Sequence, residues 1–146
     1  MPGQPEGEFD VTTLEAIETE PSGVQHPSSI FDFGEQFNLQ ATFQGSGTQW
    51  ENMKLNRFAY VAQFFAEGMG PGVADQDFGT TNGNLTPAQN VYEVGSPNAS
   101  INAVGIFRCM VVVTFRGPAT PPRPWIGFLG FNQDCVIQVH AFEEFG

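Results

Sequence analysis

FRCMVVVTF, residues 107–115, is the stretch of sequence that decides the fold class. Alternate positions in it share one apolar parity, made up of Phe107, Cys109, Val111, Val113 and Phe115. Side chains along a β-strand point to opposite faces in turn, so this parity predicts the buried face of a central strand. Met110 and Val112 make the other face apolar as well. That second face therefore needs cover, either from this chain or from another one.

A cleaner alternation lies upstream, in FNLQATF (residues 37–43), where Phe, Leu and Ala alternate with Asn, Gln and Thr. This pattern is typical of a strand that keeps one face in water. Further strand patterns occupy residues 58–66, 125–131 and 135–142, with shorter ones near 90–94 and 101–104. We interpret QGSGTQW (residues 44–50) as a turn, and no amphipathic helix of three turns is visible.

These strand patterns, separated by Gly- and Pro-rich turns, predict an all-β fold. We expect an antiparallel β-sandwich of about seven or eight strands, immunoglobulin-like, C2-like or jelly-roll-like. Residues 30–146 would form the sandwich domain. Residues 1–29 are rich in Pro, Glu and Ser and are predicted to be an acidic N-terminal arm.

The charge balance narrows the choice of partners. The chain has 146 residues, with 16 acidic against five basic side chains, for a net charge of −11. A strongly negative surface repels phosphate backbones and anionic lipids, so we predict no nucleic-acid partner. No 18-residue apolar run is present, which predicts no membrane insertion. The first residues lack the basic and apolar pattern of a signal peptide, which favours a cytoplasmic location.

Catalytic chemistry has little support in the sequence. The only His and Cys residues are His26, His140, Cys109 and Cys135, and no catalytic motif or metal-binding spacing connects them. Cys135 and His140 have opposite parity on one strand, so they should point to opposite faces. We therefore predict no enzyme and no cofactor. The two cysteines are interpreted as buried small apolar residues, with a single disulfide left open as an alternative.

A ligand-binding alternative rests on the irregular stretch 68–104. Its segment DQDFGTTNGN (residues 75–84) offers the oxygen donors Asp75, Asp77, Asn82 and Asn84. Such groups suit Ca²⁺ or a carbohydrate, although the spacing differs from an EF-hand loop. The same residue types are also common in turns.

The surplus of apolar residues on both strand faces carries the main functional hypothesis. We predict a non-catalytic domain that acts through protein–protein contacts, most simply by self-association into a homo-oligomer. The residues expected to serve as core or contact anchors are Phe64, Phe65, Met110, Val112, Trp125 and Phe128.

Overall fold

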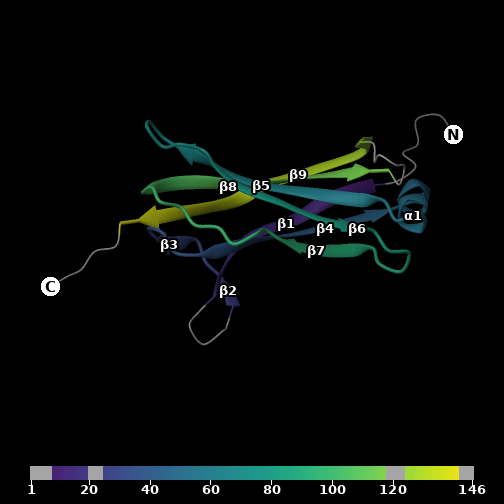
Figure 1. Ribbon diagram of the computed structural model, residues 1–146, viewed down its shortest axis with the longest axis horizontal. Helices are drawn as coiled ribbons and strands as arrows, with labels where there is room; N and C mark the ends of the chain where they lie inside the picture. The colour runs from purple at the N-terminus through teal and green to yellow at the C-terminus, as the bar shows by residue number, and fades with distance from the viewer. Residues whose placement is uncertain (1–7, 20–24, 118–123, 142–146) are drawn as a thin grey trace.

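The computed structural model describes the backbone of residues 8–19, 25–117 and 124–141, and the side chains of these except residues 19, 25, 26 and 124–129. Two β-sheets and one short helix make up the described chain (Figure 1). The elements are β1 (Glu8–Thr19), β2 (Gln25–Pro27), β3 (Ile30–Asp32), β4 (Phe37–Ser46), α1 (Thr48–Leu55), β5 (Ala59–Met69), β6 (Gln76–Asn84), β7 (Val91–Gly95), β8 (Gly105–Arg116) and β9 (Pro124–His140).

The strands form a four-stranded sheet in the order β2-β1-β4-β7 and a five-stranded sheet in the order β3-β9-β8-β5-β6. These two sheets confirm the predicted all-β fold class. The expectation of purely antiparallel pairing is wrong at one edge, because β3 runs parallel to β9. Parallel neighbours need a long connection between them, and here almost the whole domain lies between these two strands.

The core lies between the two sheets, and the predicted buried parity of β8 is confirmed. Its five inward residues, from Phe107 to Phe115, are fully buried. Phe115 contacts rings from three other elements, with centroid distances of 5.0 Å to Phe9, 6.2 Å to Phe43 and 5.9 Å to Trp50. Burying each such ring contributes about 1.5–3 kcal/mol, so this aromatic cluster is a principal source of stability.

The acidic segment predicted as an arm contains a full strand of the domain. β1 lies between β2 and β4, and its pairing with β4 extends from Glu8 to Glu18. A register shift between Val11 and Thr13 brings both Val11 and Leu14 to the buried side. The domain of the structure therefore begins well before the predicted boundary at residue 29. Residues 1–7 and 20–24 lie outside the described residues.

Four other segments differ from the prediction. The turn predicted at residues 44–50 is instead the end of β4 and the start of α1, whose Trp50 and Met53 are buried on one face of the helix. At eight residues, α1 is too short to show a helical period in the sequence. Residues 76–84 form the edge strand β6, whereas residues 101–104 form no strand. The two predicted C-terminal strands are one continuous strand, β9.

Candidate functional site

The outer face of the five-stranded sheet carries an apolar patch in its middle. Phe65 on β5 lies opposite Met110 on β8, and Val112 on β8 lies opposite Phe131 on β9. We call these four residues the outer apolar patch. The Phe131 side chain is 62% exposed, and the other three are half-buried. Met110 and Val112 of this patch form the second apolar face of β8, which the sequence predicted would be covered by another part of the protein or by a second chain.

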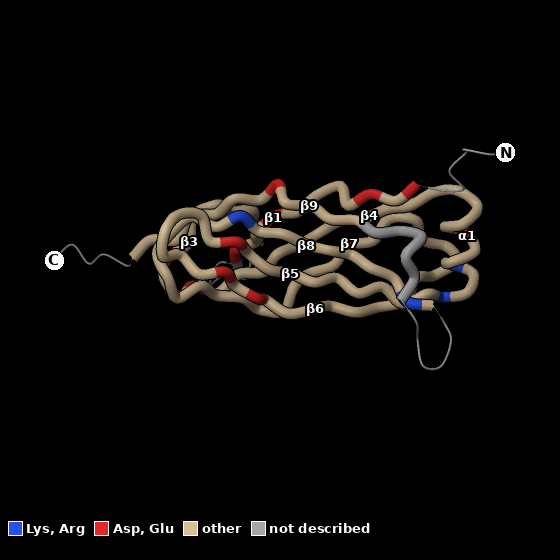
Figure 2. The backbone as a smooth tube through the Cα atoms, turned by 90° about the horizontal axis from the view of Figure 1, so that it is seen from above, with Lys and Arg blue, Asp and Glu red and all other residues tan. Residues whose placement is uncertain are grey.

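Charged residues border this patch but are absent from the middle of β5 and of β8, the strands that carry most of it. β5 has no charged side chain from Ala59 to Ala66, and β8 has none from Cys109 to Phe115. Figure 2 shows the middle of β5 and β8 without charged positions, which lie toward the ends of the sheet. Asp77 on β6 lies directly opposite Phe65, so a partner that covers the patch meets a charge at its β6 border but none along the middle of β5 and β8. Desolvating a charge is the costly step in apolar association, and the contact is therefore favourable only where that border stays in water.

The outer face of the four-stranded sheet has a different character. Its outward positions on β4 are polar, and their side chains bond to neighbouring groups of the same sheet. Asn38 Nδ2 donates to the Ser96 carbonyl at 2.9 Å, and Gln40 Nε2 donates to a Glu93 carboxylate oxygen at 3.5 Å. This is the solvated sheet face that the alternation of residues 37–43 predicts, so the two outer faces differ in kind.

The predicted contact anchors separate into three groups. Phe65, Met110 and Val112 lie on the outer face, within the outer apolar patch. Phe64 is fully buried and belongs to the core, because it has the opposite parity to Phe65. Trp125 and Phe128 lie outside the residues whose side chains the structure describes. Phe131 was missed, although its segment is apolar at both parities and already pointed to an apolar outer surface.

A hollow of 430 Å³ adjoins the patch where β5 meets β6. Phe65, Asp75 and Asp77 are among its lining residues. Asn82 and Asn84 lie farther along β6. At about 3.3 Å per residue, Asn82 is roughly 16 Å from Asp77. The four predicted oxygen donors therefore do not converge on one site. Among the described residues, no cluster of three or more His, Cys, Asp or Glu side chains is arranged to hold a metal ion.

Asp75 and Asp77 each accept a hydrogen bond from the backbone. Oδ1 of Asp75 accepts from the Gly68 amide at 3.0 Å, and Oδ1 of Asp77 accepts from the Gly79 amide at 2.9 Å. Such bonds stabilise the turn before β6 and the irregular register inside it.

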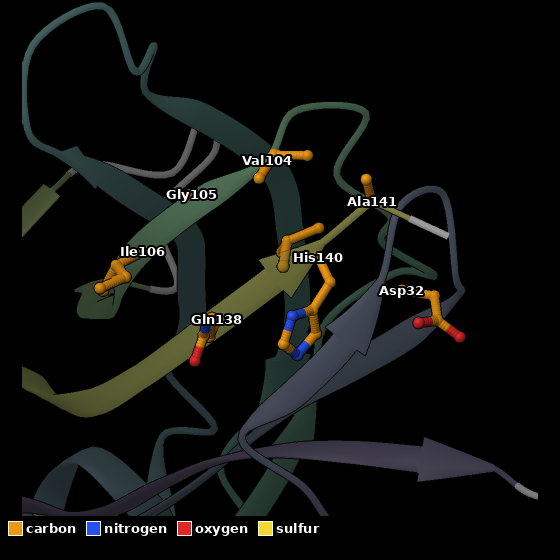
Figure 3. Close-up of a pocket in the computed structure, with 8 residues that line it drawn as sticks. Asp32, Val104, Gly105, Ile106, Gln138, His140 and Ala141 are labelled. Carbon is orange, nitrogen blue, oxygen red and sulfur yellow. The ribbon is translucent and has the colours of Figure 1, made fainter. Parts of the chain in front are cut away.

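A second pocket, of 520 Å³, lies at the end of the five-stranded sheet where β3 meets β9 (Figure 3). Asp32 and His140 are opposite each other in the parallel pairing, and Gln138 and Ile106 also line the pocket. In Figure 3 the Asp32 carboxylate and the His140 imidazole lie apart, and no ion pair connects these two described residues. The pocket is a hollow of mixed polar and apolar lining, in which Asp32 and His140 do not form an acid–base pair.

Comparisons with known proteins give resemblances at the level of the fold alone. No family model and no curated protein matches this sequence. The chain is similar to the CARDB domain of the PF1109 protein from Pyrococcus furiosus, with a TM-score of 0.47 and 8% identity, over 96% of this chain and 98% of that one. It is also similar to a β-glucosidase from Listeria innocua, with a TM-score of 0.47 and 10% identity.

The glucosidase match covers 92% of this chain but 16% of that enzyme. At these scores neither likeness carries an argument about function. Within the described residues, no helix has the length and apolar character to cross a bilayer.

Proposed function

We propose that this protein is a non-catalytic β-sandwich that self-associates, with the outer apolar patch of one copy packed on the same patch of a second copy. The observation that carries the proposal is the pairing of Phe65 with Met110 and of Val112 with Phe131 on an outward-facing sheet surface. A patch that meets itself across a two-fold axis forms a closed dimer.

The net negative charge of the chain opposes self-association, so a second copy can pack on the patch only through an apolar contact. Two chains that each carry a net charge of −11 repel one another. The middle of β5 and β8 is where this repulsion acts least directly, because it has no charged side chains. Each Å² of apolar surface removed from water there contributes about 25 cal/mol. Added salt screens the repulsion between exposed charges, so it should strengthen the dimer.

The mass of the protein in solution tests this proposal. Light scattering coupled to size exclusion should give twice the mass of one chain at micromolar concentrations. The dimer fraction should rise with protein concentration and with sodium chloride. A single-chain mass at every concentration, in low and in high salt, would overturn the proposal. A dimer that salt dissociates would point to an ionic contact instead.

The finer fold class belongs to the same proposal. Apart from the three-residue strands β2 and β3, the sheet orders are β1-β4-β7 and β9-β8-β5-β6. This arrangement corresponds to strands A-B-E and G-F-C-C′ of an immunoglobulin-like sandwich. We therefore favour the immunoglobulin-like class over the C2-like and jelly-roll-like alternatives.

A second candidate function is binding of a small ligand in the hollow beside Phe65. One aromatic ring and the two carboxylates of Asp75 and Asp77 line this hollow, a combination that suits a carbohydrate or Ca²⁺. Calorimetric titration with calcium chloride and with a panel of sugars tests it. Asp77→Asn should weaken any binding that is found, and the absence of heat with every probe would remove this candidate.

A further inference from the structure

Cys109 and Cys135 lie directly opposite each other on β8 and β9, beside a register shift in that pairing. Both are free, buried thiols. Directly opposed residues in antiparallel strands have Cα atoms about 4.5–5.5 Å apart. That spacing falls within the range of about 4.4–6.8 Å that disulfides require. The backbone spacing of this pair therefore allows a disulfide between the two cysteines.

The two thiols differ in their access to solvent. Cys109 is fully buried in the core, whereas Cys135 keeps 9% of its surface exposed. Cys135 also lines a surface pocket of 330 Å³, together with Glu15 and Ala16 of β1 and Ser28 beyond β2. A small reagent can therefore approach Cys135 through this pocket, whereas Cys109 is fully buried and does not line it.

The same pair is polarised toward a thiolate on Cys135. The hydrogen bond from the Cys109 thiol lowers the pKa of Cys135, and the backbone amide of Ala16 adds to this. Burial and the nearby Glu15 carboxylate oppose the shift without reversing it. The pKa of Cys109 is raised, first by its hydrogen bond to Cys135 and then by burial. Since the thiolate is the reactive form, Cys135 is the better nucleophile of the two.

We propose that Cys135 and Cys109 are a dithiol pair that a small disulfide, such as oxidised glutathione, converts into an intramolecular disulfide by reaction first at Cys135. The Cys135 thiolate attacks one glutathione sulfur, the S–S bond of the reagent breaks, and one glutathione leaves as a thiolate. Cys109 then loses its proton and attacks the Cys135 sulfur, which releases the second glutathione. In total the protein loses two electrons and two protons, and one oxidised glutathione becomes two reduced ones.

Intact-mass measurement on the folded protein tests this order of events. After incubation with oxidised glutathione, the wild type should lose the mass of two hydrogens and keep no adduct. Cys109→Ser should retain the mass of one glutathione, because the second thiol is missing. Cys135→Ser should remain unmodified while folded. In urea both variants should take up one glutathione, which shows that burial and not chemistry protects Cys109.

A measurement on the wild type alone covers the case in which a serine variant does not fold. Brief alkylation of the native protein with iodoacetamide, followed by peptide mapping, should label Cys135 in preference to Cys109, because Cys135 lines a surface pocket and Cys109 is fully buried. Equal labelling of the two cysteines would overturn the proposal. So would a wild type that keeps both thiols in excess oxidised glutathione while the urea-unfolded chain reacts.

Discussion

Replacing Gly130 of β9 with alanine tests whether the acidic N-terminal strand is built into the domain. A β-carbon at Gly130 would lie 2.5 Å from Cε2 of Phe9 and 2.9 Å from Cγ2 of Val11, both on β1. The Phe9 ring cannot simply move away, because Phe115 and Phe43 hold it at centroid distances of 5.0 Å and 5.6 Å. The absence of a side chain at Gly130 lets β1 and β9 approach each other.

The magnitude follows from two opposing effects. Overpacking a closed core costs about 1–3 kcal/mol. Alanine also restricts the unfolded chain, which returns about 0.4–1 kcal/mol. We therefore expect Gly130→Ala to lower the free energy of unfolding by about 1–2 kcal/mol. For a chain of roughly 150 residues, that corresponds to a fall in melting temperature of about 2–8 °C.

Denaturant unfolding measures this effect against a matched control. Gly95 also lies in a strand, but a β-carbon there would meet nothing closer than the Leu39 carbonyl oxygen at 3.9 Å. Gly95→Ala should therefore keep or slightly raise the midpoint, whereas Gly130→Ala should lower it at an unchanged slope. In a Phe9→Leu background, the cost of Gly130→Ala should shrink. Equal stability of the two alanine variants would refute the close contact between β1 and β9.

Burial raises the pKa of the Glu35 carboxyl, and the nearby Glu18 carboxylate adds to the shift. The folded pKa then lies above the unfolded one, so stability falls as the pH rises through that window. Glu35→Gln should melt higher than the wild type at neutral pH but not in acid, and an equal difference at both pH values would contradict this. The buried Lys54 ammonium bonds to Asn90 Oδ1, and its stem packs in the core. In chemical denaturation, Lys54→Ala should lower the free energy of unfolding by about 2–3 kcal/mol, because it removes the packed stem. Lys54→Met keeps the stem and should lower it much less, and an equal loss in both variants would show that packing of the stem is unimportant. Oxidising the dithiol pair closes a loop of about 25 residues, so the oxidised form should be more stable by about 3 kcal/mol. Calorimetric melts with and without reductant check this, and a lower melting temperature for the oxidised form would oppose it.

The sequence predicted those elements whose pattern is regular. The alternation in residues 107–115 and 37–43 predicted β8 and β4 with the correct buried faces, because a plain strand shows its period directly. The residues of β1 could not be assigned to a strand from the sequence, because the register shift puts Val11 and Leu14 on the same side and breaks the period. The helix α1 was missed because one or two turns carry too little periodicity to stand out.

The candidate site shows the same limit. Met110 and Val112 could be placed on a second apolar face from β8 alone. Their contact with Phe65 and Phe131 depends on the register between strands, which no single-strand pattern contains. The pairing of Cys109 with Cys135 depends on the same register. For the predicted oxygen donors, closeness in sequence was misleading, since an extended strand separates Asp77 from Asn82.

The central claim is that the outer apolar patch is covered by a second copy of the chain, and one comparison by sedimentation equilibrium tests it most directly. Phe131→Glu places a charge in the patch, whereas Val91→Glu places one on the outer sheet face opposite, at a valine that is 49% exposed. The account predicts a dimer for the wild type and for Val91→Glu, and a folded monomer for Phe131→Glu. A Phe131→Glu variant that dimerises as tightly as the wild type would contradict it.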